Sequence, residues 1–167
     1  MECIINPNNW NIQYAAVQLG AIYKTTDAWQ NSTLIVNNNL QTTGINQESA
    51  WVTPYLMHPT NNNTLIVGKS QVYQTTNAGA TWSQLGTISG MNGMIKSMAY
   101  APSNPQVIYV ATYYHFYTNN GVNNWQSSTG SNNSDKITYI AVDPNNAQRV
   151  FITKSGYSSN NKVWESN

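Results

Sequence analysis

Hydrophobic and polar positions along this chain follow the short rhythm of β-strands. Alternating runs such as 95–101 and 137–143 each end at a proline, and an asparagine follows within two residues. Alternation of apolar and polar residues predicts a strand with one buried face, and proline with asparagine favours a turn. Nearly continuous apolar runs come next, at 65–67, 107–110 and 150–152, and such runs predict strands buried on both faces. No stretch has helical periodicity, so we expect antiparallel β-structure.

This unit recurs four times, because one proline closes the first predicted strand of each copy. These prolines are Pro7, Pro59, Pro102 and Pro144. They are 52, 43 and 42 residues apart, and a period of about 40–50 residues built from short strands is typical of a propeller or an array. We therefore expect an all-β fold, a β-propeller domain over 1–167 made of four-stranded antiparallel blades. The predicted repeats cover roughly 1–40, 50–88, 94–130 and 136–167.

Each unit also has an aromatic third strand and a Thr/Asn-rich loop that ends in tryptophan. The third-strand tyrosines are Tyr23, Tyr73, Tyr117 and Tyr157. The tryptophans, each expected to open the fourth strand, are Trp29, Trp82, Trp125 and Trp164. The chain begins inside a predicted first strand and ends just after Trp164 opens a fourth. The length allows a closed ring of four blades, but we expect part of a ring of about seven or eight blades, completed by the remainder of a longer chain or by a second copy.

One of these loops, Thr75-Thr-Asn-Ala-Gly-Ala-Thr-Trp82, resembles the Asp-box, or bacterial neuraminidase repeat, written Ser/Thr-x-Asp-x-Gly-x-Thr-Trp. Asn77 stands where that family has Asp, and the other three loops are degenerate versions. The resemblance implies an Asp-box β-propeller, as found in sialidases, sortilin-like domains and xyloglucanase-type glycoside hydrolases. In that family the loop lies on the outer rim, away from the funnel that holds ligands.

The resemblance therefore implies structural roles for the loop residues. A short Asp or Asn side chain accepts backbone N–H groups, glycine supplies positive φ, and tryptophan buries a large apolar surface. The residues concerned are Asp27, Trp29, Asn77, Gly79, Trp82, Asn119, Gly121, Trp125, Asn160 and Trp164.

Composition narrows the choice of partners and cofactors. Charged residues make up 8% of the chain and the net charge is +1, so no field is expected that would attract nucleic acid. No apolar run approaches the roughly 18 residues that span a bilayer, and we expect no membrane insertion. Cys3 is the single cysteine, which rules out a disulfide within the chain, and no metal-ligand cluster is visible. We expect no metal and no cofactor.

Catalysis has few candidate residues in this sequence. Sialidases of the family hold their substrate with three arginines, whereas Arg149 is the only arginine here. Glycoside hydrolysis needs two carboxylates at a defined separation. Most of the six acids fall in turns, in an Asp-box-like loop or at the ends of the chain, which leaves Glu48 and Asp135 as catalytic candidates.

A ligand surface is predicted where the resemblance places the funnel: at the turns between second and third strands and at the connections between blades. The expected ligand-binding residues are Lys69, Tyr113, Tyr114, His115, Lys154 and Trp51. The turn 113–115 is aromatic, whereas its counterparts are Leu19-Gly20, Lys69-Ser70 and Ser155-Gly156. Rings beside neutral polar neighbours suit a neutral glycan or an extended polypeptide, bound with little dependence on salt. The alternative is that the tyrosines pack against a neighbouring blade.

The leading hypothesis is a non-catalytic binding or scaffold propeller, secreted or on the cell surface, with a glycan or protein partner. The alternative is a fragment of an Asp-box glycoside hydrolase whose catalytic acids lie partly outside this chain.

Overall fold

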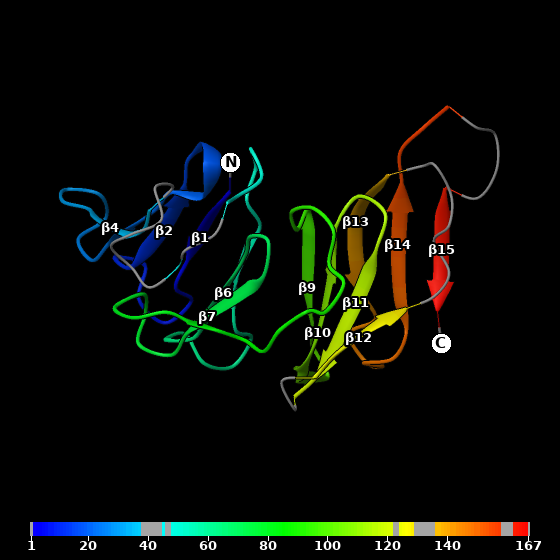
Figure 1. Cartoon of the computed structure of the whole chain (residues 1–167). Coiled ribbons are helices and arrows are strands. Elements are labelled where there is room, and N and C mark those ends of the chain that lie inside the picture. Colours follow the sequence, from blue (N-terminus) through cyan, green and yellow to red (C-terminus); the bar gives the residue numbers. More distant parts are fainter. Residues whose placement is uncertain are drawn as a thin grey trace.

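The computed structural model describes residues 2–37, 45, 48–121, 124–128, 136–157 and 162–166. Four antiparallel sheets follow one another along the chain, and each is made of consecutive strands (Figure 1). We call them blades 1 to 4. Blade 1 contains β1 (Cys3–Ile5), β2 (Gln13–Ala16), β3 (Ile22–Thr25) and β4 (Thr33–Val36); blade 2 contains β5 (Tyr55–Met57), β6 (Leu65–Gly68), β7 (Val72–Thr75) and β8 (Ser83–Gln84); blade 3 contains β9 (Ser97–Ala101), β10 (Asn104–Ala111), β11 (Phe116–Asn120) and β12 (Trp125–Ser128); and blade 4 contains β13 (Ile137–Val142), β14 (Val150–Lys154) and β15 (Val163–Ser166).

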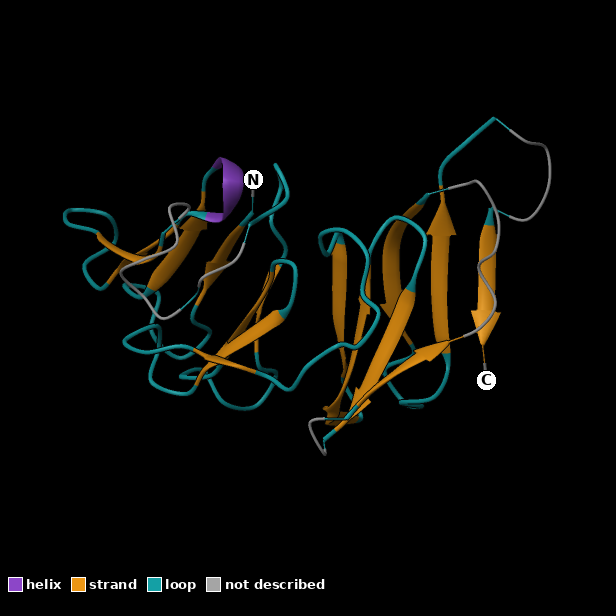
Figure 2. Ribbon diagram, viewed as in Figure 1, coloured by secondary structure: helices purple, strands orange, loops and turns teal. Residues whose placement is uncertain are grey.

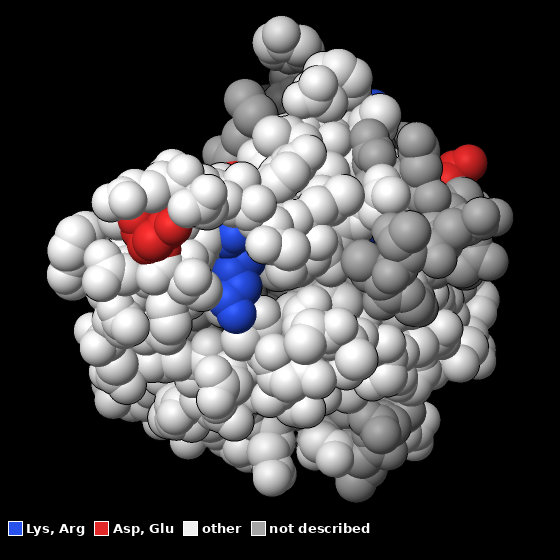
Figure 3. Space-filling model, turned by 90° about the vertical axis from the view of Figure 1, so that its left-hand side faces the viewer, with Lys and Arg blue, Asp and Glu red and all other residues white. Residues whose placement is uncertain are grey.

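The chain is therefore an all-β protein with propeller blades, as the repeat period predicts. Within the described residues the helical structure is one short 3-10 turn, Gln18–Gly20 (Figure 2), and no described helix has the length and apolarity to cross a membrane. The four sheets are placed side by side and do not close into a ring. Charges are sparse on the surface: on the side drawn in Figure 3, most of the described surface is uncharged.

The hydrophobic core lies between neighbouring blades. One cluster joins Tyr14 and Val36 of blade 1 to Leu65 and Trp82 of blade 2, and two further clusters join blades 2 and 3 and blades 3 and 4. Every residue of β6 is buried and so are the residues 107–111 of β10, as their continuous apolar runs predict. In β14 the run is only partly buried, because Phe151 and Ile152 are half-buried. Apolar burial between sheets is what holds a blade against the next one.

Blade 4 departs from the predicted layout. Tyr157 is fully exposed and lies outside the strands, and the third strand is β15, in which Trp164 faces Ile152 of β14. In blade 2 the corresponding pair is Val67 and Tyr73, so Trp164 takes the place of a third-strand tyrosine. The prediction that Trp164 opens a fourth strand was wrong, because the third strand begins at Val163, farther along the sequence from the end of the second strand at Lys154 than in the other blades.

The two ends of the blades differ in what they carry. One end of the blades, here called the funnel end, holds the connections between second and third strands and the residues just before each first strand. These connections are residues 17–21, 69–71, 112–115 and 155–162. The funnel end is uppermost in Figure 1 for blades 3 and 4. The opposite end, here called the rim end, holds the proline–asparagine turns and the loops between third and fourth strands. Within each of blades 1 and 2, the proline–asparagine turn contacts the loop between the third and fourth strands. The backbone N–H of Ala28 donates to the carbonyl of Asn11 in blade 1, and that of Ala78 donates to the carbonyl of Asn63 in blade 2.

Candidate functional site

At the rim end of blade 2, the loop 75–82 is held together by its own side chains. The Thr75 hydroxyl accepts hydrogen bonds from the backbone N–H groups of Asn77 (3.3 Å) and Gly79 (3.0 Å). Asn77 Oδ1 accepts from the Thr75 hydroxyl (2.8 Å) and from the N–H of Thr81 (2.9 Å). Asn77 Nδ2 donates to the Thr81 hydroxyl at 2.8 Å. The side chains of Thr75 and Asn77 therefore satisfy the backbone of the tight loop.

The loop 25–33 of blade 1 repeats this network residue for residue. The Thr25 hydroxyl accepts from the N–H groups of Asp27 (3.2 Å) and Trp29 (2.9 Å), and Asp27 accepts from the backbone and side chain of Asn31 (2.8 Å each). The backbone N–H of Asn31, followed by its side chain and the Thr25 hydroxyl, lowers the pKa of Asp27 below the usual range. Asp27 thus takes the role of Asn77.

Counting along this shared network corrects the predicted place of Trp29. Trp29 occupies the position of Gly79, with φ of 72° against 93°, and Ser32 occupies the position of Trp82. The Trp29 side chain is 40% exposed, and its Nε1 donates to Gln13 at 2.7 Å. Blade 1 therefore has no counterpart of Trp82 in this loop.

Trp82 and Trp125 join successive blades. Trp82 Nε1 donates to the backbone carbonyl of Ile35 at 3.0 Å, and Trp125 Nε1 donates to that of Leu85 at 2.6 Å. Both side chains are buried, Trp82 with 7% exposed. A Cβ added to Gly79 would lie 2.6 Å from Ile35 Cδ1, so the glycine leaves room for the preceding blade as well as adopting positive φ.

In blade 3 the predicted correspondence is also displaced. Asn119 lies opposite Ile108 near the end of the third strand, is 2% exposed, and its Oδ1 accepts from the N–H of Gly121 at 3.0 Å. In blade 2 the Thr75 hydroxyl accepts the same kind of hydrogen bond from the N–H of Asn77. Asn119 therefore occupies the Thr75 position, and Gly121 (φ 90°) occupies the Asn77 position. The loop Asn160 of blade 4 lies outside the described residues.

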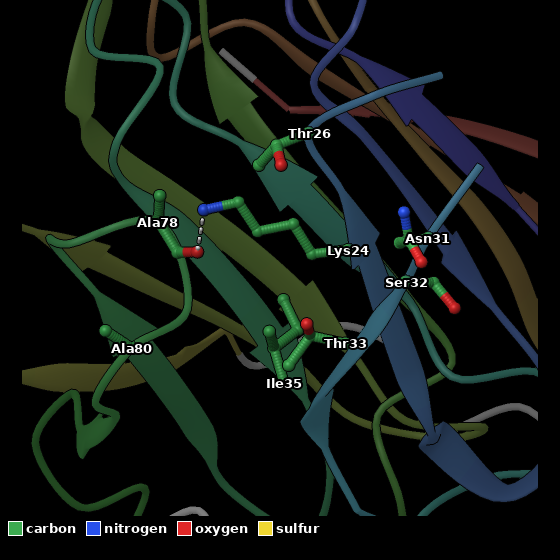
Figure 4. Close-up of a pocket in the computed structure, with 8 residues that line it drawn as sticks. All are labelled: Lys24, Thr26, Asn31, Ser32, Thr33, Ile35, Ala78 and Ala80. Carbon is green, nitrogen blue, oxygen red and sulfur yellow. Dashed lines mark hydrogen bonds between the residues drawn. The ribbon is translucent and has the colours of Figure 1, made fainter. Parts of the chain in front are cut away.

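A hollow of about 290 Å³ separates the rim loops of blades 1 and 2. The Lys24 side chain crosses it and donates to the carbonyl of Ala78 at 3.1 Å (Figure 4). Burial lowers the pKa of Lys24. The residues that line the hollow are Lys24, Thr26, Asn31, Ser32, Thr33, Ile35, Ala78 and Ala80. The hydrogen bond adds a second polar tie between the two blades, which sequence reasoning missed because it joins residues 54 positions apart.

At the funnel end, the aromatic turn of blade 3 is exposed and anchored to blade 4. The Tyr113 and Tyr114 side chains are 41% and 45% exposed, and their ring centroids lie 6.3 Å apart. The Tyr113 carbonyl accepts from the N–H of Ile137 at 2.7 Å. The N–H of His115 donates to the Thr112 hydroxyl at 3.2 Å. The backbone is thus fixed at both ends of the turn while the two rings remain at the surface.

Two lysines flank this turn, which corrects the expectation of neutral neighbours. The ammonium groups of Lys96 and Lys136 lie 4.5 Å and 4.7 Å from the centroid of the Tyr113 ring. Cation–π attraction favours such an arrangement. Lys96 directly precedes β9 and Lys136 directly precedes β13, so the fold brings both lysines to the turn between them. Sequence reasoning missed Lys96 because the predicted first strand, 95–101, included it, whereas β9 begins one residue later at Ser97.

Lys69 and Lys154 occupy equivalent positions at the ends of the second strands, and both are buried. Lys69 is fully buried; its Nζ donates to the carbonyl of Asn37 at 3.2 Å, and burial lowers its pKa to about 8. Lys154 is 6% exposed, with Nζ 4.8 Å from the Trp164 ring and no hydrogen-bond partner within the described structure. Neither side chain lies on the open surface predicted for ligand contact.

The acids divide between the two ends. At the rim end, Asp143 and Glu165 pair with Arg149 at 3.3 Å and 2.7 Å. Glu48 is exposed and lines a hollow of about 390 Å³ together with Ser70 and Gln71. Its proposed catalytic companion, Asp135, lies outside the described residues. Among the residues that are described, no three of His, Cys, Asp and Glu gather as metal ligands would.

Trp51 lies in the connection between blades 1 and 2. Its side chain is exposed, and its backbone carbonyl accepts from the N–H of Leu19 at 3.1 Å. It therefore belongs to the funnel end of blade 1 and is separate from the aromatic turn of blade 3.

No protein-family model and no curated protein matches this sequence. Its fold is similar to solved β-propellers. An ancestral GH74 enzyme aligns with a TM-score of 0.69 at 19% identity, over 99% of this chain and 22% of the other. The GH74 enzyme of Niastella koreensis gives 0.64 at 18%, over 91% and 25%. YCF48 bound to D1 peptide gives 0.58 at 15%, over 94% and 46%. The chain thus spans between about a fifth and about half of these proteins, and at these identities the likeness concerns the fold.

Proposed function

We propose that this chain is a non-catalytic binding module of an Asp-box type propeller, secreted or on the cell surface. Its ligand is a glycan or a polypeptide, bound at the funnel end of blade 3. The observation that carries the proposal is the pair of exposed rings, Tyr113 and Tyr114, on a turn whose backbone is fixed. The corresponding turns of blades 1 and 2 have no such rings, and the connection in blade 4 carries one exposed ring, Tyr157. A pair of rings is therefore not a requirement of the scaffold at this place.

The rim end supports the Asp-box part of the proposal. These loops have structural roles. Hydrogen bonds to Thr25 and Thr75 hold the loops of blades 1 and 2, and Trp82 and Trp125 bind the backbone of the preceding blade. Three of the acids also serve the scaffold there: Asp27 holds a loop, and Asp143 and Glu165 hold Arg149. Ligand contact is therefore assigned to the other end of the blades.

The test is a binding titration against a panel of soluble polysaccharides and extended peptides. Replacing Tyr113 and Tyr114 together by serine should abolish binding and leave the melting temperature nearly unchanged, because both rings are exposed. Tyr139→Ser is the control, since Tyr139 is also exposed but lies on the sheet face of β13. A large fall in melting temperature for the double variant would show that the rings serve interblade packing, which contradicts the proposal.

The second candidate is a fragment of an Asp-box glycoside hydrolase. One observation favours it: Glu48 faces a funnel-end hollow large enough for part of a sugar chain. The catalytic acids of such an enzyme would lie partly outside this chain, so the whole protein should release reducing sugar from a polysaccharide. If this chain supplies one of the two carboxylates, Glu48→Gln or Asp135→Asn should abolish that release. Release that persists unchanged in both variants would remove this pair from the mechanism.

A further inference from the structure

Charge is unevenly distributed along the blades. Five of the six lysines lie at the funnel end, namely Lys69, Lys96, Lys136, Lys154 and Lys162. At that end the described carboxylates, Glu2 and Glu48, belong to blade 1 and to the connection that follows it. The described funnel-end residues of blades 3 and 4 include four lysines and no acid; Asp135 lies outside them. Among the described residues, positive charge is therefore concentrated at this end of blades 3 and 4, in a chain whose net charge is only +1.

The aromatic turn sits inside this field. Lys96 comes from blade 3 and Lys136 from blade 4, and their ammonium groups lie 4.5 Å and 4.7 Å from the same Tyr113 ring. A ligand that carries a carboxylate can pair with these ammonium groups, whereas a neutral sugar cannot, and charge-assisted hydrogen bonds are stronger than neutral ones.

Lys154 provides an independent sign of an absent anion. It faces Ile137 across the β13–β14 pair, next to Lys136, and the N–H of Ser155 donates to the Lys136 carbonyl at 2.8 Å. Its side chain is 6% exposed, and its Nζ lies 4.8 Å from the centroid of the Trp164 ring but has no hydrogen-bond partner in the described structure. Buried charges in proteins are normally paired and hydrogen-bonded, because a charge without such partners costs several kcal/mol or more. An anion at the junction of blades 3 and 4 would supply the hydrogen-bond acceptor that the Trp164 ring does not.

We propose that the junction of blades 3 and 4 at the funnel end binds a uronate-containing polysaccharide. This deepens the binding function proposed above and rests on it. A uronate unit combines a carboxylate with a pyranose ring that has an apolar C–H face, which matches lysines beside exposed tyrosine rings. Acidic polypeptides share the charge but not the ring, and they serve as a test of the assignment.

The test compares the whole chain with three probes by calorimetric titration: polygalacturonate, the same polymer with its carboxylates methyl-esterified, and polyglutamate. Polygalacturonate should bind at least about tenfold more tightly than either of the others, and its binding should weaken as salt rises. Lys96→Gln with Lys136→Gln should weaken it by about tenfold. The control Lys24→Gln with Arg149→Gln removes two charges at the rim end and should leave the affinity unchanged.

Lys154→Met supplies a readout that a purely structural lysine would not give. It should weaken polygalacturonate binding while raising the melting temperature of the unliganded chain, because it removes a buried charge that has no hydrogen-bond partner in the described structure. Equal binding of the methyl ester would leave the binding function standing and overturn the anionic ligand. Equal or tighter binding of polyglutamate would assign the site to acidic polypeptides instead. If no polysaccharide or peptide binds, both this inference and the proposed function fail.

Discussion

Trp82 and Trp29 should respond very differently to mutation, although the sequence places both at the end of a repeat loop. Trp82 is 7% exposed, packs in the cluster between blades 1 and 2, and donates to the Ile35 carbonyl. Deleting a large buried aromatic side chain costs roughly 3–5 kcal/mol. The missing donor places Trp82→Ala near the upper part of that range, since an unpaired buried acceptor costs about 1–3 kcal/mol. For a chain of this size, the melting temperature should fall by roughly 10 °C.

Trp29→Gly is the matched comparison. Trp29 has φ of 72° and lies where blade 2 has Gly79. Left-handed backbone costs a non-glycine residue roughly 1–2 kcal/mol, and relief of this cost offsets the removal of a side chain that is already 40% exposed. The free energy of unfolding, measured by urea titration, should change by less than about 1 kcal/mol. Similar decreases for Trp29→Gly and Trp82→Ala would refute the assignment of the two positions.

Three further outcomes are expected. Gly79→Val should destabilise strongly in thermal melts, by roughly 3 kcal/mol or more, because it combines φ of 93° with a contact of 2.6 Å to Ile35; a melt like that of the parent contradicts the close approach. The pKa of Asp27 is lowered in the folded state, so its stabilising effect is present above about pH 4 and is lost as pH falls further. Asp27→Asn should remove this acid sensitivity, as judged by melting temperatures across the acid range, and an unchanged profile would contradict it. The pKa of Lys69 is lowered from 10.5 to about 8 in the folded chain. Between these pH values the unfolded chain holds a proton that the folded chain lacks. The free energy of unfolding should therefore rise with pH, by up to about 1.4 kcal/mol per pH unit. Burial raises the pKa values of Tyr55 and Tyr100, so stability should fall again above about pH 10, and Lys69→Met should abolish the rise.

The repeat architecture could be predicted from the sequence because its signals are local. The proline–asparagine turns and the apolar second strands recur at a fixed period, and each depends on neighbours within a few residues. Blade 4 shows where this reasoning stops. Its turn after Lys154 is longer than the sister turns, so a count of residues from the apolar strand places Trp164 in the wrong strand.

Tryptophan does not mark equivalent positions in the degenerate loops. The positions are set instead by the threonine that ends the third strand, and counting four residues from Thr25 and Thr75 pairs Trp29 with Gly79. That signal was present in the sequence. The charge around the aromatic turn depends on contacts that are distant in sequence. Lys96 reaches Tyr113 through the pairing of β9 with β10 inside blade 3, and Lys136 reaches it only when blade 4 has packed against blade 3.

Nuclear magnetic resonance of the isotopically labelled chain tests the central claim most directly, because it locates the ligand. Titration with oligogalacturonate should shift backbone amide signals of the turn 112–115, of Lys96 and of Lys136, and should leave the rim loops 25–33 and 75–82 unchanged. Shifts confined to the rim loops, or no shifts with any glycan or peptide that is tried, would contradict a binding site at the funnel end of blades 3 and 4.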